Sequence, residues 1–172
     1  LLEHLWRSFR FTLKNRGPHG LPLIGRADWN DCLNLNCFST NPDESYQTAG
    51  QKGGGTAESV MIAGLFCSAA EAFAGLLAQR GQSTAEVLAG RDAIQQAITS
   101  HGRDAAWFVR AYDAESRAIG VAANSAGRIF IESQGWCIMG GNGLDDGFAR
   151  RTLDAVEEHL ATRHGIVLQQ PA

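Results

Sequence analysis

The chain has little excess charge of either sign, and this excludes the first classes of partner. Its 15 Lys and Arg residues stand against 18 Asp and Glu, which leaves a formal net charge of −3. Nucleic acids and anionic membranes select basic surfaces, whereas disordered chains contain far less than the 44% of hydrophobic residues found here. We therefore expect a packed globular protein without a nucleic-acid or membrane partner.

Paired cysteines and long hydrophobic runs are also missing. The four cysteines, Cys32, Cys37, Cys67 and Cys137, form no Cys-x-x-Cys pair, and no histidine stands at metal-ligand spacing from them. We expect buried or loop thiols in a reducing compartment. No apolar run approaches the roughly 18 residues needed to cross a bilayer, so the expected location is the cytoplasm.

Proline is rare but glycine is abundant, with 4 prolines and 20 glycines among 172 residues. Glycine thus exceeds its average share of roughly 7%. We expect some glycines to shape loops and others to act in helices. The predicted helix ends are Gly17, Gly102 and Gly165, and the predicted close-packing positions are Gly64 and Gly75.

Neither end of the sequence has the features of a domain boundary. Residues 1–6 already have helical periodicity, without a start methionine, a capping residue or a signal-peptide pattern. Residues 168–172 form an extended stretch that no further element terminates. The length allows one domain, and we expect an internal piece of a longer protein.

Apolar spacing predicts a mainly α protein. A helix that is apolar almost all round must be buried on most sides, and here such a helix precedes an amphipathic one. This order suits two concentric layers of helices. The predicted helices cover residues 1–16, 56–79, 83–101, 134–139 and 145–163.

Two local features are predicted between these helices. Ser83 and Glu86 have the spacing of a capping box, in which Ser83 accepts from the third helical N–H and Glu86 reaches back. Residues 107–112 and 129–131 have the composition of short strands and flank a turn at residues 124–127. They predict one small β-hairpin within the helical fold.

The long segment between the first two helices holds the best candidate for chemistry. From Gly17 to about Gly55 no periodicity persists, and unstructured loops of about 40 residues are usually functional or disordered. Residues 25–32 combine two carboxylates, a guanidinium, an amide and an indole. These groups suit a sugar site, because hydroxyls need polar partners, an indole covers a pyranose face and a carboxyl can protonate a glycosidic oxygen. Asx turns, helix caps and a core Trp are the structural alternatives.

The sequence of this segment is similar to that of a known family. Residues 20–34 closely resemble the active-site loop of the inverting disaccharide phosphorylases of glycoside hydrolase family 94. The Asp-Trp-Asn-Asp core at residues 28–31 occurs across that family, and the continuation at residues 32–36 resembles the branch that acts on cellobiose. The resemblance covers essentially the whole chain, because it extends through residues 57–60, 111–113, 129–132 and 164–171.

This resemblance implies a fold and a set of site residues. The chain, residues 1–172, would be part of an (α/α)6-barrel catalytic domain that is incomplete at both ends. Asp31 would be the general acid, and Trp29 would line the subsite for the non-reducing glucosyl unit. Arg26, Asp28 and Asn30 would shape the sugar sites or hydrogen-bond to them.

The implied reaction is the phosphorolysis of cellobiose to α-glucose 1-phosphate and glucose, with inversion. The substrates would be the disaccharide and inorganic phosphate, with no metal or organic cofactor, and the full-length protein would be a homodimer. In the family the phosphate is held by residues C-terminal to the matched region, so the piece alone is expected to be inactive. The acceptor sugar is left open.

Two alternatives remain at this stage. One is an inverting glycoside hydrolase on the same barrel, in which a second carboxylate activates water. The other is a non-catalytic helical module that binds sugar or forms an assembly surface. An intact acid within residues 28–31 argues against a pure binding module.

Five further polar or aromatic residues have structural explanations beside functional ones. Glu58 is expected to satisfy the N-terminus of the apolar helix rather than to bind sugar. Gln134 and Trp136 lie either in the core or near the barrel centre. His159 and His164 are expected at a helix cap or on the surface, not at a metal.

Overall fold

The computed structural model describes residues 1–25, 35–36 and 55–171. Its helices are α1 (Leu2–Lys14), α3 (Val60–Gln79), α4 (Ala85–His101), α5 (Ile131–Met139) and α6 (Phe148–Leu160). Its strands are β1 (Glu58–Ser59), β2 (Arg103–Asp104), β3 (Trp107–Phe108), β4 (Ala111–Tyr112), β5 (Ala118–Ile119), β6 (Ile129–Phe130), β7 (Ala161–Thr162), β8 (Gly165–Ile166) and β9 (Gln169–Gln170). The prediction of a mainly α fold with a small β component is confirmed.

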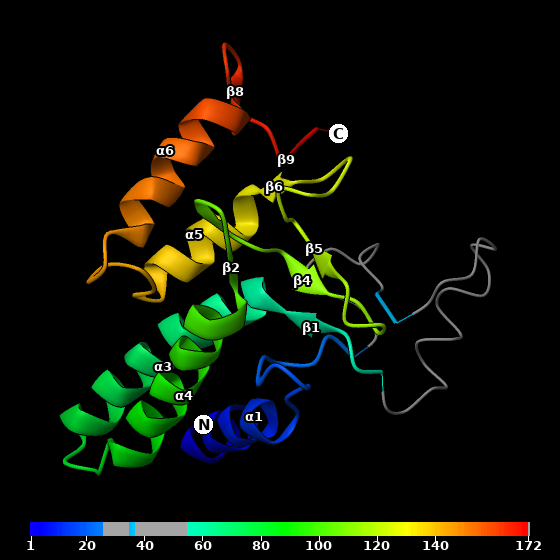
Figure 1. Cartoon of the computed structure of the whole chain (residues 1–172). Helices are drawn as coiled ribbons and strands as arrows, with labels where there is room; N and C mark the ends of the chain where they lie inside the picture. The colour runs from blue at the N-terminus through cyan, green and yellow to red at the C-terminus, as the bar shows by residue number, and fades with distance from the viewer. Residues whose placement is uncertain (26–34, 37–54, 172) are drawn as a thin grey trace.

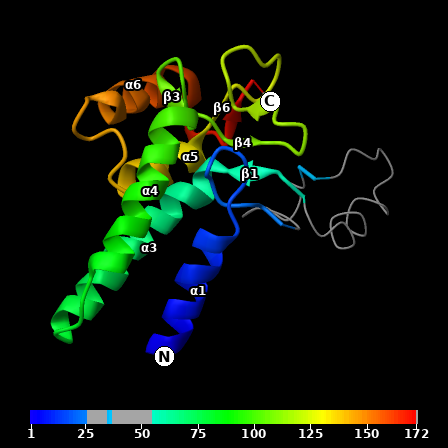
Figure 2. The same ribbon diagram turned by 60° about the horizontal axis from the view of Figure 1, so that its bottom comes forward.

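Helices α1, α3 and α4 form one layer of the molecule, α5 lies across the N-terminal half of α3, and α6 packs against α5 on the side away from α3 (Figure 1). Figures 1 and 2 show β1, β4 and β5 beyond the N-terminal end of α3. Residues 25 and 35–36 lie on the same side of the molecule as these strands. The helices therefore make up the body of the molecule, the sheet β1–β4–β5 lies beyond the N-terminal end of α3, and the β7–β8 pair projects from the end of α6.

The core of this body is apolar. Buried side chains from α1, α3, α4, α5 and α6 form one cluster that includes Phe9, Leu77 and Ile94. Phe9 stacks on Phe66 with 5.2 Å between the ring centroids. The amphipathic pattern predicted for residues 1–16 is confirmed, because the partly buried side chains of α1 pack against this cluster.

Helix α3 corrects the expectation about hydrophobic runs. By length and composition alone it could cross a membrane, since it has 20 residues and its most apolar window has a mean hydropathy of 1.9. It packs against α4 on one side and α5 on the other. Its apolar character is therefore that of a central helix with neighbours on most sides, as the sequence pattern predicted.

Glycine permits two of the closest helix contacts. A Cβ on Gly64 would lie 2.6 Å from the backbone of Trp136 and Cys137, so the predicted close approach at this position is confirmed. Gly90 has the same function between α4 and α1, which the sequence did not indicate. Gly75 was predicted wrongly, because it is exposed and a Cβ there would meet no atom within 4 Å.

Of the three predicted helix ends, one is confirmed and two are corrected. Helix α4 ends at Gly102 as predicted. Helix α1 ends at Lys14, before Gly17, and α6 ends at Leu160, where Ala161 turns extended and Gly165 enters the β7–β8 pair.

The predicted start of the apolar helix is also corrected. Residues 56–59 are not helical, and α3 begins at Val60. Ser59 has an extended backbone and caps α3, because its hydroxyl accepts from the Ile62 N–H at 3.0 Å. Residues 58 and 59 therefore belong to a strand and a cap rather than to a first helical turn.

The predicted capping box is wrong, and the predicted small β excursion is present with other strand partners. The Ser83 hydroxyl accepts from the Ala85 N–H at 3.4 Å, while Glu86 pairs with Arg10 of α1 through two hydrogen bonds of 2.7 and 2.9 Å. A bidentate guanidinium provides stronger hydrogen bonds for Glu86 than a backbone N–H does. The strands exist, but β3 pairs with β2, β4 with β1 and β5, and β6 with β9. A strand of two residues is too short for an alternating apolar and polar pattern, so the sequence does not indicate which strand it pairs with.

Two of the predicted thiols can be placed. Cys67 and Cys137 are buried and free, as predicted, whereas Cys32 and Cys37 lie outside the described residues. Burial raises the pKa of Cys67 to about 12 and raises that of Cys137 well above its usual value. Both thiols are therefore protonated and function as small apolar side chains.

Candidate active site

All five predicted site residues fall in a segment that the structure does not describe. Arg26, Asp28, Trp29, Asn30 and Asp31 lie within residues 26–34, so their positions and contacts cannot be compared with the prediction. The structure does describe the chain on both sides of this segment. We call residues 22–25, 35–36, 55–59 and 111–114 the site frame.

Strand β1 is the centre of the site frame. Residues 22–24 run along one edge of it: the Ile24 N–H donates to the Ala57 carbonyl at 2.9 Å, and the Ser59 N–H donates to the Pro22 carbonyl at 3.0 Å. Strand β4 pairs along its other edge. The chain therefore enters the candidate segment from a position fixed against β1.

Asn36 fixes the frame on the other side of the candidate segment. Its Nδ2 donates to the Gly25 carbonyl at 2.8 Å, and its Oδ1 accepts from the Ala57 N–H at 3.1 Å. The Leu35 carbonyl accepts from the Ala114 N–H at 3.0 Å. Residues 25 and 36, which flank the candidate segment, are thus joined directly to each other.

A buried carboxylate supports the chain just upstream. Glu58 is fully buried, and its carboxylate accepts from the backbone N–H of His19 at 3.0 Å, from that of Leu21 at 3.1 Å and from His19 Nδ1 at 2.5 Å. Gly17 makes room for it, because a Cβ there would lie 2.4 Å from Glu58 Cδ. The expectation that Glu58 serves the N-terminus of α3 is therefore wrong. It organises the turn at residues 17–21 instead.

An aromatic contact extends this support to α4. The His19 ring stacks on Tyr112 of β4 with 4.0 Å between the centroids, and the Tyr112 hydroxyl donates to the His101 carbonyl at 2.6 Å. Burial, with smaller contributions from the charges of Glu58 and Asp104, raises the pKa of Tyr112. The neutral phenol is the form that this hydrogen bond requires.

The turn after β4 completes the site frame. Asp113 is buried and accepts from the backbone N–H groups of Glu115 and Arg117, each at 2.9 Å, while its second oxygen accepts from Arg117 Nε at 2.7 Å. This Asx turn fixes Ala114, whose carbonyl accepts from the Thr56 hydroxyl at 3.0 Å. The two strands of the frame are therefore tied to the residues that border the candidate segment.

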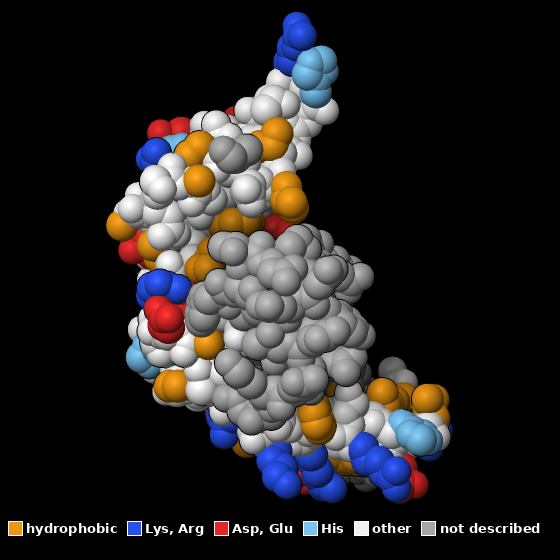
Figure 3. Space-filling view, turned by 90° about the vertical axis from the view of Figure 1, so that its right-hand side faces the viewer, with side chains coloured by type: hydrophobic (Ala, Val, Ile, Leu, Met, Phe, Trp, Pro, Cys, Tyr) orange, Lys and Arg blue, Asp and Glu red, His pale blue; other side chains and the backbone are white. Residues whose placement is uncertain are grey.

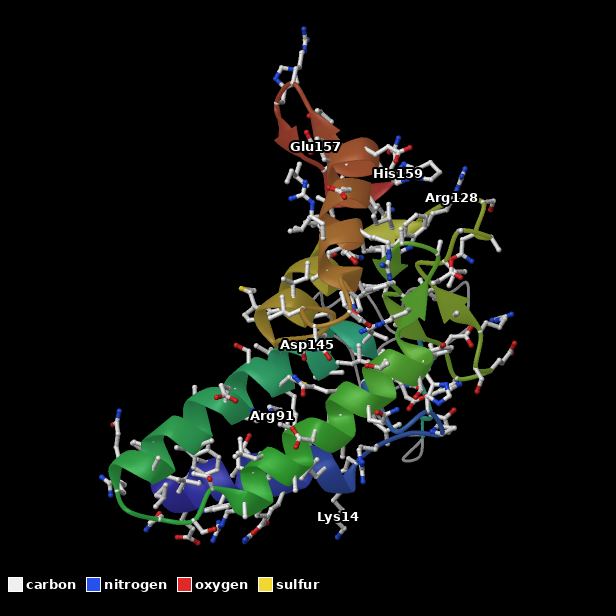
Figure 4. The ribbon with its side chains drawn as sticks, turned by 60° about the vertical axis from the view of Figure 1, so that its left-hand side comes forward. Lys14, Arg91, Arg128, Asp145, Glu157 and His159 are labelled. Carbon is white, nitrogen blue, oxygen red and sulfur yellow. The ribbon has the colours of Figure 1, made fainter. Side chains whose placement is uncertain are left out.

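The other singled-out residues take structural positions. Gln134 is buried; its Oε1 accepts from the Phe108 N–H and its Nε2 donates to the Phe108 and Phe130 carbonyls, all at 2.7 to 2.8 Å. This satisfied amide holds β3 against α5. His159 lies on the surface with its ring edge toward Trp107, and His164 is exposed, so the surface position predicted for both is confirmed (Figure 4).

A cavity elsewhere in the molecule is not a competing active site. It has a volume of about 470 Å³ and lies between α3, α4 and the end of α5. Figure 4 shows Arg91 between α3 and α4, where it forms ion pairs with Glu71 and Asp92. The cation is thus already satisfied by protein carboxylates, and the Cys67 thiol that lines the same cavity is protonated.

Charge is unevenly distributed around the site frame. In Figure 3, Lys and Arg side chains gather along the lower edge of the molecule, the end at which α1 lies in Figure 1. The charged side chains of the frame itself, Glu58 and Asp113, are buried and hydrogen-bonded. Within the described part of the chain, the frame therefore positions its neighbours rather than supplying exposed charge.

Neither Asn36 nor Asp113 was predicted to support the site, and Glu58 was predicted to have a different partner. Signals for them did exist. Asn36 ends the family-like run at residues 20–36, and Asp113 ends the family-like stretch 111–113. The resemblance draws attention to these positions but does not reveal their contacts. The partners of Asn36, for example, are backbone groups 11 and 21 positions away in the sequence.

The chain is similar to known proteins along its whole length. A model described as the Glycosyl hydrolase 94 superfamily, catalytic domain, matches residues 1–172. The chain is 28% identical to N,N'-diacetylchitobiose phosphorylase of Vibrio furnissii, over 99% of this chain and 19% of that protein. It is 29% identical to solabiose phosphorylase of Paenibacillus borealis, over 98% of this chain and 20% of that protein.

A third relative has a different substrate in its name. The chain is 25% identical to cellobionic acid phosphorylase of Neurospora crassa, over 99% of this chain and 20% of that protein. The chain therefore spans about a fifth of the length of the curated relatives that it matches.

Proposed function

Because the chain belongs to the glycosyl hydrolase 94 superfamily, we propose that the protein at its full natural length is an inverting disaccharide phosphorylase. The observation that carries this proposal is the family match across residues 1–172, which includes the Asp-Trp-Asn-Asp sequence at residues 28–31. The three relatives described above are all named as phosphorylases of disaccharides or related glycosides.

The fold agrees with this membership. The catalytic domain of the family is of the (α/α)6-barrel type, and the helical pairs α3–α4 and α5–α6 form a segment of such a barrel. The sheet β1–β4–β5 lies at the N-terminal end of α3, from which the site frame extends. In the proposed arrangement the body provides a rigid wall, and the segment held by the frame faces the substrate.

In the proposed mechanism Asp31 is the general acid. Its carboxyl proton passes to the glycosidic oxygen as the bond from that oxygen to the anomeric carbon breaks, and the leaving sugar departs as an alcohol. A phosphate oxygen forms the new bond from the opposite face, so a β-glycoside gives an α-sugar phosphate. Asp31 is left as a carboxylate and regains a proton from solvent.

The remaining residues of the motif are assigned to the sugar. We assign Trp29 to the apolar face of the non-reducing unit, and Arg26, Asp28 and Asn30 to its hydroxyl groups or to the shape of the site. Phosphate is an anionic nucleophile, so no second carboxylate is needed to activate it, unlike water in an inverting hydrolase. The mechanism therefore uses phosphate as a co-substrate and no metal or organic cofactor.

The finer proposal is that the substrate is cellobiose, with α-glucose 1-phosphate and glucose as products. It rests on residues 32–36, which continue the motif as in the cellobiose-cleaving branch. The names of the relatives include chitobiose, solabiose and cellobionic acid, so the substrate is the part of the proposal most open to revision by experiment. A cytoplasmic location and a homodimeric assembly complete the proposal.

The test is turnover of the full-length protein with and without phosphate. Cellobiose, N,N'-diacetylchitobiose and cellobionic acid are each incubated with enzyme, and the anomer of the sugar phosphate is identified by NMR. We expect phosphate-dependent formation of α-glucose 1-phosphate, fastest with cellobiose. Release of free sugars at the same rate without phosphate would favour the hydrolase, and tight sugar binding without turnover would favour a binding module.

The catalytic assignment is tested with Asp31→Asn. General-acid catalysis contributes about 10²- to 10⁴-fold, so we expect a loss of that order toward an unactivated disaccharide. Asp154→Asn is the matched control, because Asp154 is an exposed residue of α6 whose carboxylate pairs with Arg150 at 3.1 Å, far from the site frame. If Asp31→Asn retains the activity of this control, Asp31 is not the acid.

A further inference from the structure

We propose that Asn36 is a positioning residue for the general acid, and this inference rests on the proposed function. Its side-chain amide joins the Gly25 carbonyl to the Ala57 N–H, at 2.8 and 3.1 Å. Gly25 is the last described residue before the segment that carries Asp31, and Ala57 leads into β1. One amide thus connects the entrance of the candidate segment, its exit and the strand at the centre of the site frame.

The bonding requires an amide at this position. Asn presents a donor and an acceptor at fixed geometry, whereas Asp at neutral pH only accepts. The Gly25 carbonyl needs a donor and the Ala57 N–H needs an acceptor. A carboxylate of the same shape could still accept from the Ala57 N–H. Its second oxygen, however, would place a negative charge against the Gly25 carbonyl oxygen.

Packing at Gly55 holds the amide in place. A Cβ on Gly55 would lie 2.4 Å from both Cγ and Oδ1 of Asn36, closer than real Cβ contacts. Gly55 has no positive φ, so a substitution there acts through this contact rather than through backbone strain. Residue 55 therefore offers an independent way to displace the Asn36 amide without changing Asn36.

The contact has a consequence for catalysis. The Asn36 amide holds residues 25 and 36, the two neighbours of the segment that carries Asp31, at a fixed separation, and fixing the ends of a segment lowers its conformational entropy. A misplacement of about 1 Å in a reacting group can lower a rate roughly 100-fold. Loss of the Asn36 contacts should therefore reduce the acid's contribution more than it reduces the stability of the helical body.

The experiment compares two leaving groups in the full-length protein. A disaccharide needs protonation of its leaving oxygen, but an aryl glycoside with an acidic phenol does not. For Asn36→Ala and Asn36→Asp we expect kcat for the disaccharide to fall roughly 10- to 100-fold. For the activated aryl glycoside we expect a fall of less than about threefold, with KM for phosphate unchanged.

Asn15 provides the matched control. Its Nδ2 also donates to a backbone carbonyl, that of Phe11 at 2.7 Å, but at the end of α1 and outside the site frame. Asn15→Ala and Asn15→Asp should leave both rates unchanged. Thermal unfolding of all four variants separates loss of positioning from loss of folded protein.

Gly55→Ala supplies the second route to the same result. In the wild-type background the new methyl group displaces the amide, and we expect the selective loss seen in Asn36→Ala. In the Asn36→Ala background it meets no amide, so the double variant should be no slower than Asn36→Ala alone. This non-additivity is a signature that general destabilisation does not produce.

Two outcomes would overturn the inference about Asn36. The first is an equal loss on both leaving groups for the Asn36 variants, and the second is additive effects of the substitutions at residues 36 and 55. Asp31→Asn keeps the two proposals apart. If it abolishes disaccharide turnover while the Asn36 variants remain fully active, the acid assignment stands and the positioning inference fails. If it leaves turnover intact, the proposed mechanism itself fails.

Discussion

The helical body and the site frame of this protein are held together in opposite ways. In the body, apolar side chains from five helices share one cluster, and no single contact within it is chemically specific. In the frame, three polar side chains, Asn36, Glu58 and Asp113, each bind backbone groups of other residues. The body can exchange one apolar group for another of similar volume, but a polar group in the frame leaves its partner unsatisfied when it is removed.

This difference between the body and the frame predicts which substitutions lower stability and which lower the catalytic rate. Substitutions in the body should lower stability in proportion to the volume they remove, and they should affect activity only through the amount of folded protein. Substitutions in the frame should alter the rate even where the protein remains folded. Three substitutions test this separation, from the largest expected effect on stability to the smallest.

The largest effect is expected for Leu77→Ala in the body. Leu77 is fully buried in α3, and Leu to Ala substitutions at such sites cost about 2 to 5 kcal/mol. Urea denaturation of the full-length protein should show this loss, with kcat per folded molecule unchanged. Leu153→Ala, on the 52% exposed Leu153 of α6, is the control and should cost less than about 0.5 kcal/mol. A specific fall in kcat for Leu77→Ala would contradict the separation.

A smaller loss of stability with a larger loss of rate is expected for Glu58→Gln in the frame. The backbone N–H groups of His19 and Leu21 bind the same oxygen of Glu58, so a Gln amide can keep both, but its NH₂ group then faces His19 Nδ1 and cannot accept from it. Loss of a hydrogen bond to a charged group costs about 1.5 to 3 kcal/mol, and the turn before the candidate segment should shift. Disaccharide phosphorolysis and thermal unfolding measure the two effects.

Glu71→Gln is the matched control for this change. Glu71 pairs with Arg91 at the surface of the body, where its side chain is 66% exposed, and such pairs contribute less than about 1 kcal/mol. It should leave both rate and stability nearly unchanged. Equal behaviour of the two Gln variants would remove the distinction between buried and exposed carboxylates.

The smallest effect is expected for Asp146→Asn, a polar contact outside the frame. The Arg103 guanidinium, together with the Phe148 N–H, holds the pKa of Asp146 below its usual value. The resulting stability is present above the unfolded pKa and is lost as the pH falls through the lower, folded pKa. Because the Asp146 side chain is half exposed, the gain is less than about 0.5 kcal/mol.

The measurement for Asp146 is the pH dependence of thermal unfolding. Wild type should be slightly more stable than Asp146→Asn near neutral pH, and the difference should vanish under acid conditions below the folded pKa. A difference that grows as the pH falls has the wrong sign for this ion pair and would contradict the assignment.

The sequence predicted the body better than the frame, for a physical reason. Helical periodicity reports how a segment meets its immediate surroundings, so the buried faces of α1, α3 and α4 could be predicted from spacing alone. Strand partners and the bonds of Glu58 depend on segments that are far apart in sequence. The strand pairing of the hairpin and the role of Glu58 were therefore predicted wrongly, because local pattern contains no information on which distant backbone group is near.

The residues of the candidate site also fall into two groups, those that the sequence predicted and those that only the structure identified. Asp31 and its neighbours were predicted from a resemblance, and they lie outside the residues that the structure describes. Asn36 became a candidate only when the structure showed its two backbone partners. The glycines are a further example: Gly64 could be predicted from an apolar helix, but the role of Gly17 could not, because the side chain that fills its space comes from residue 58.

The buried Glu58 also determines which substitutions the protein can accumulate. Two of its partners are main-chain N–H groups, those of His19 and Leu21, and every residue except proline supplies such a group. For these two bonds, the identity of the side chains at positions 19 and 21 does not matter. Position 58 must keep its acceptor, and position 17 must keep the space that a Cβ would occupy. In a saturation-mutagenesis map, intolerance should concentrate on positions 17 and 58.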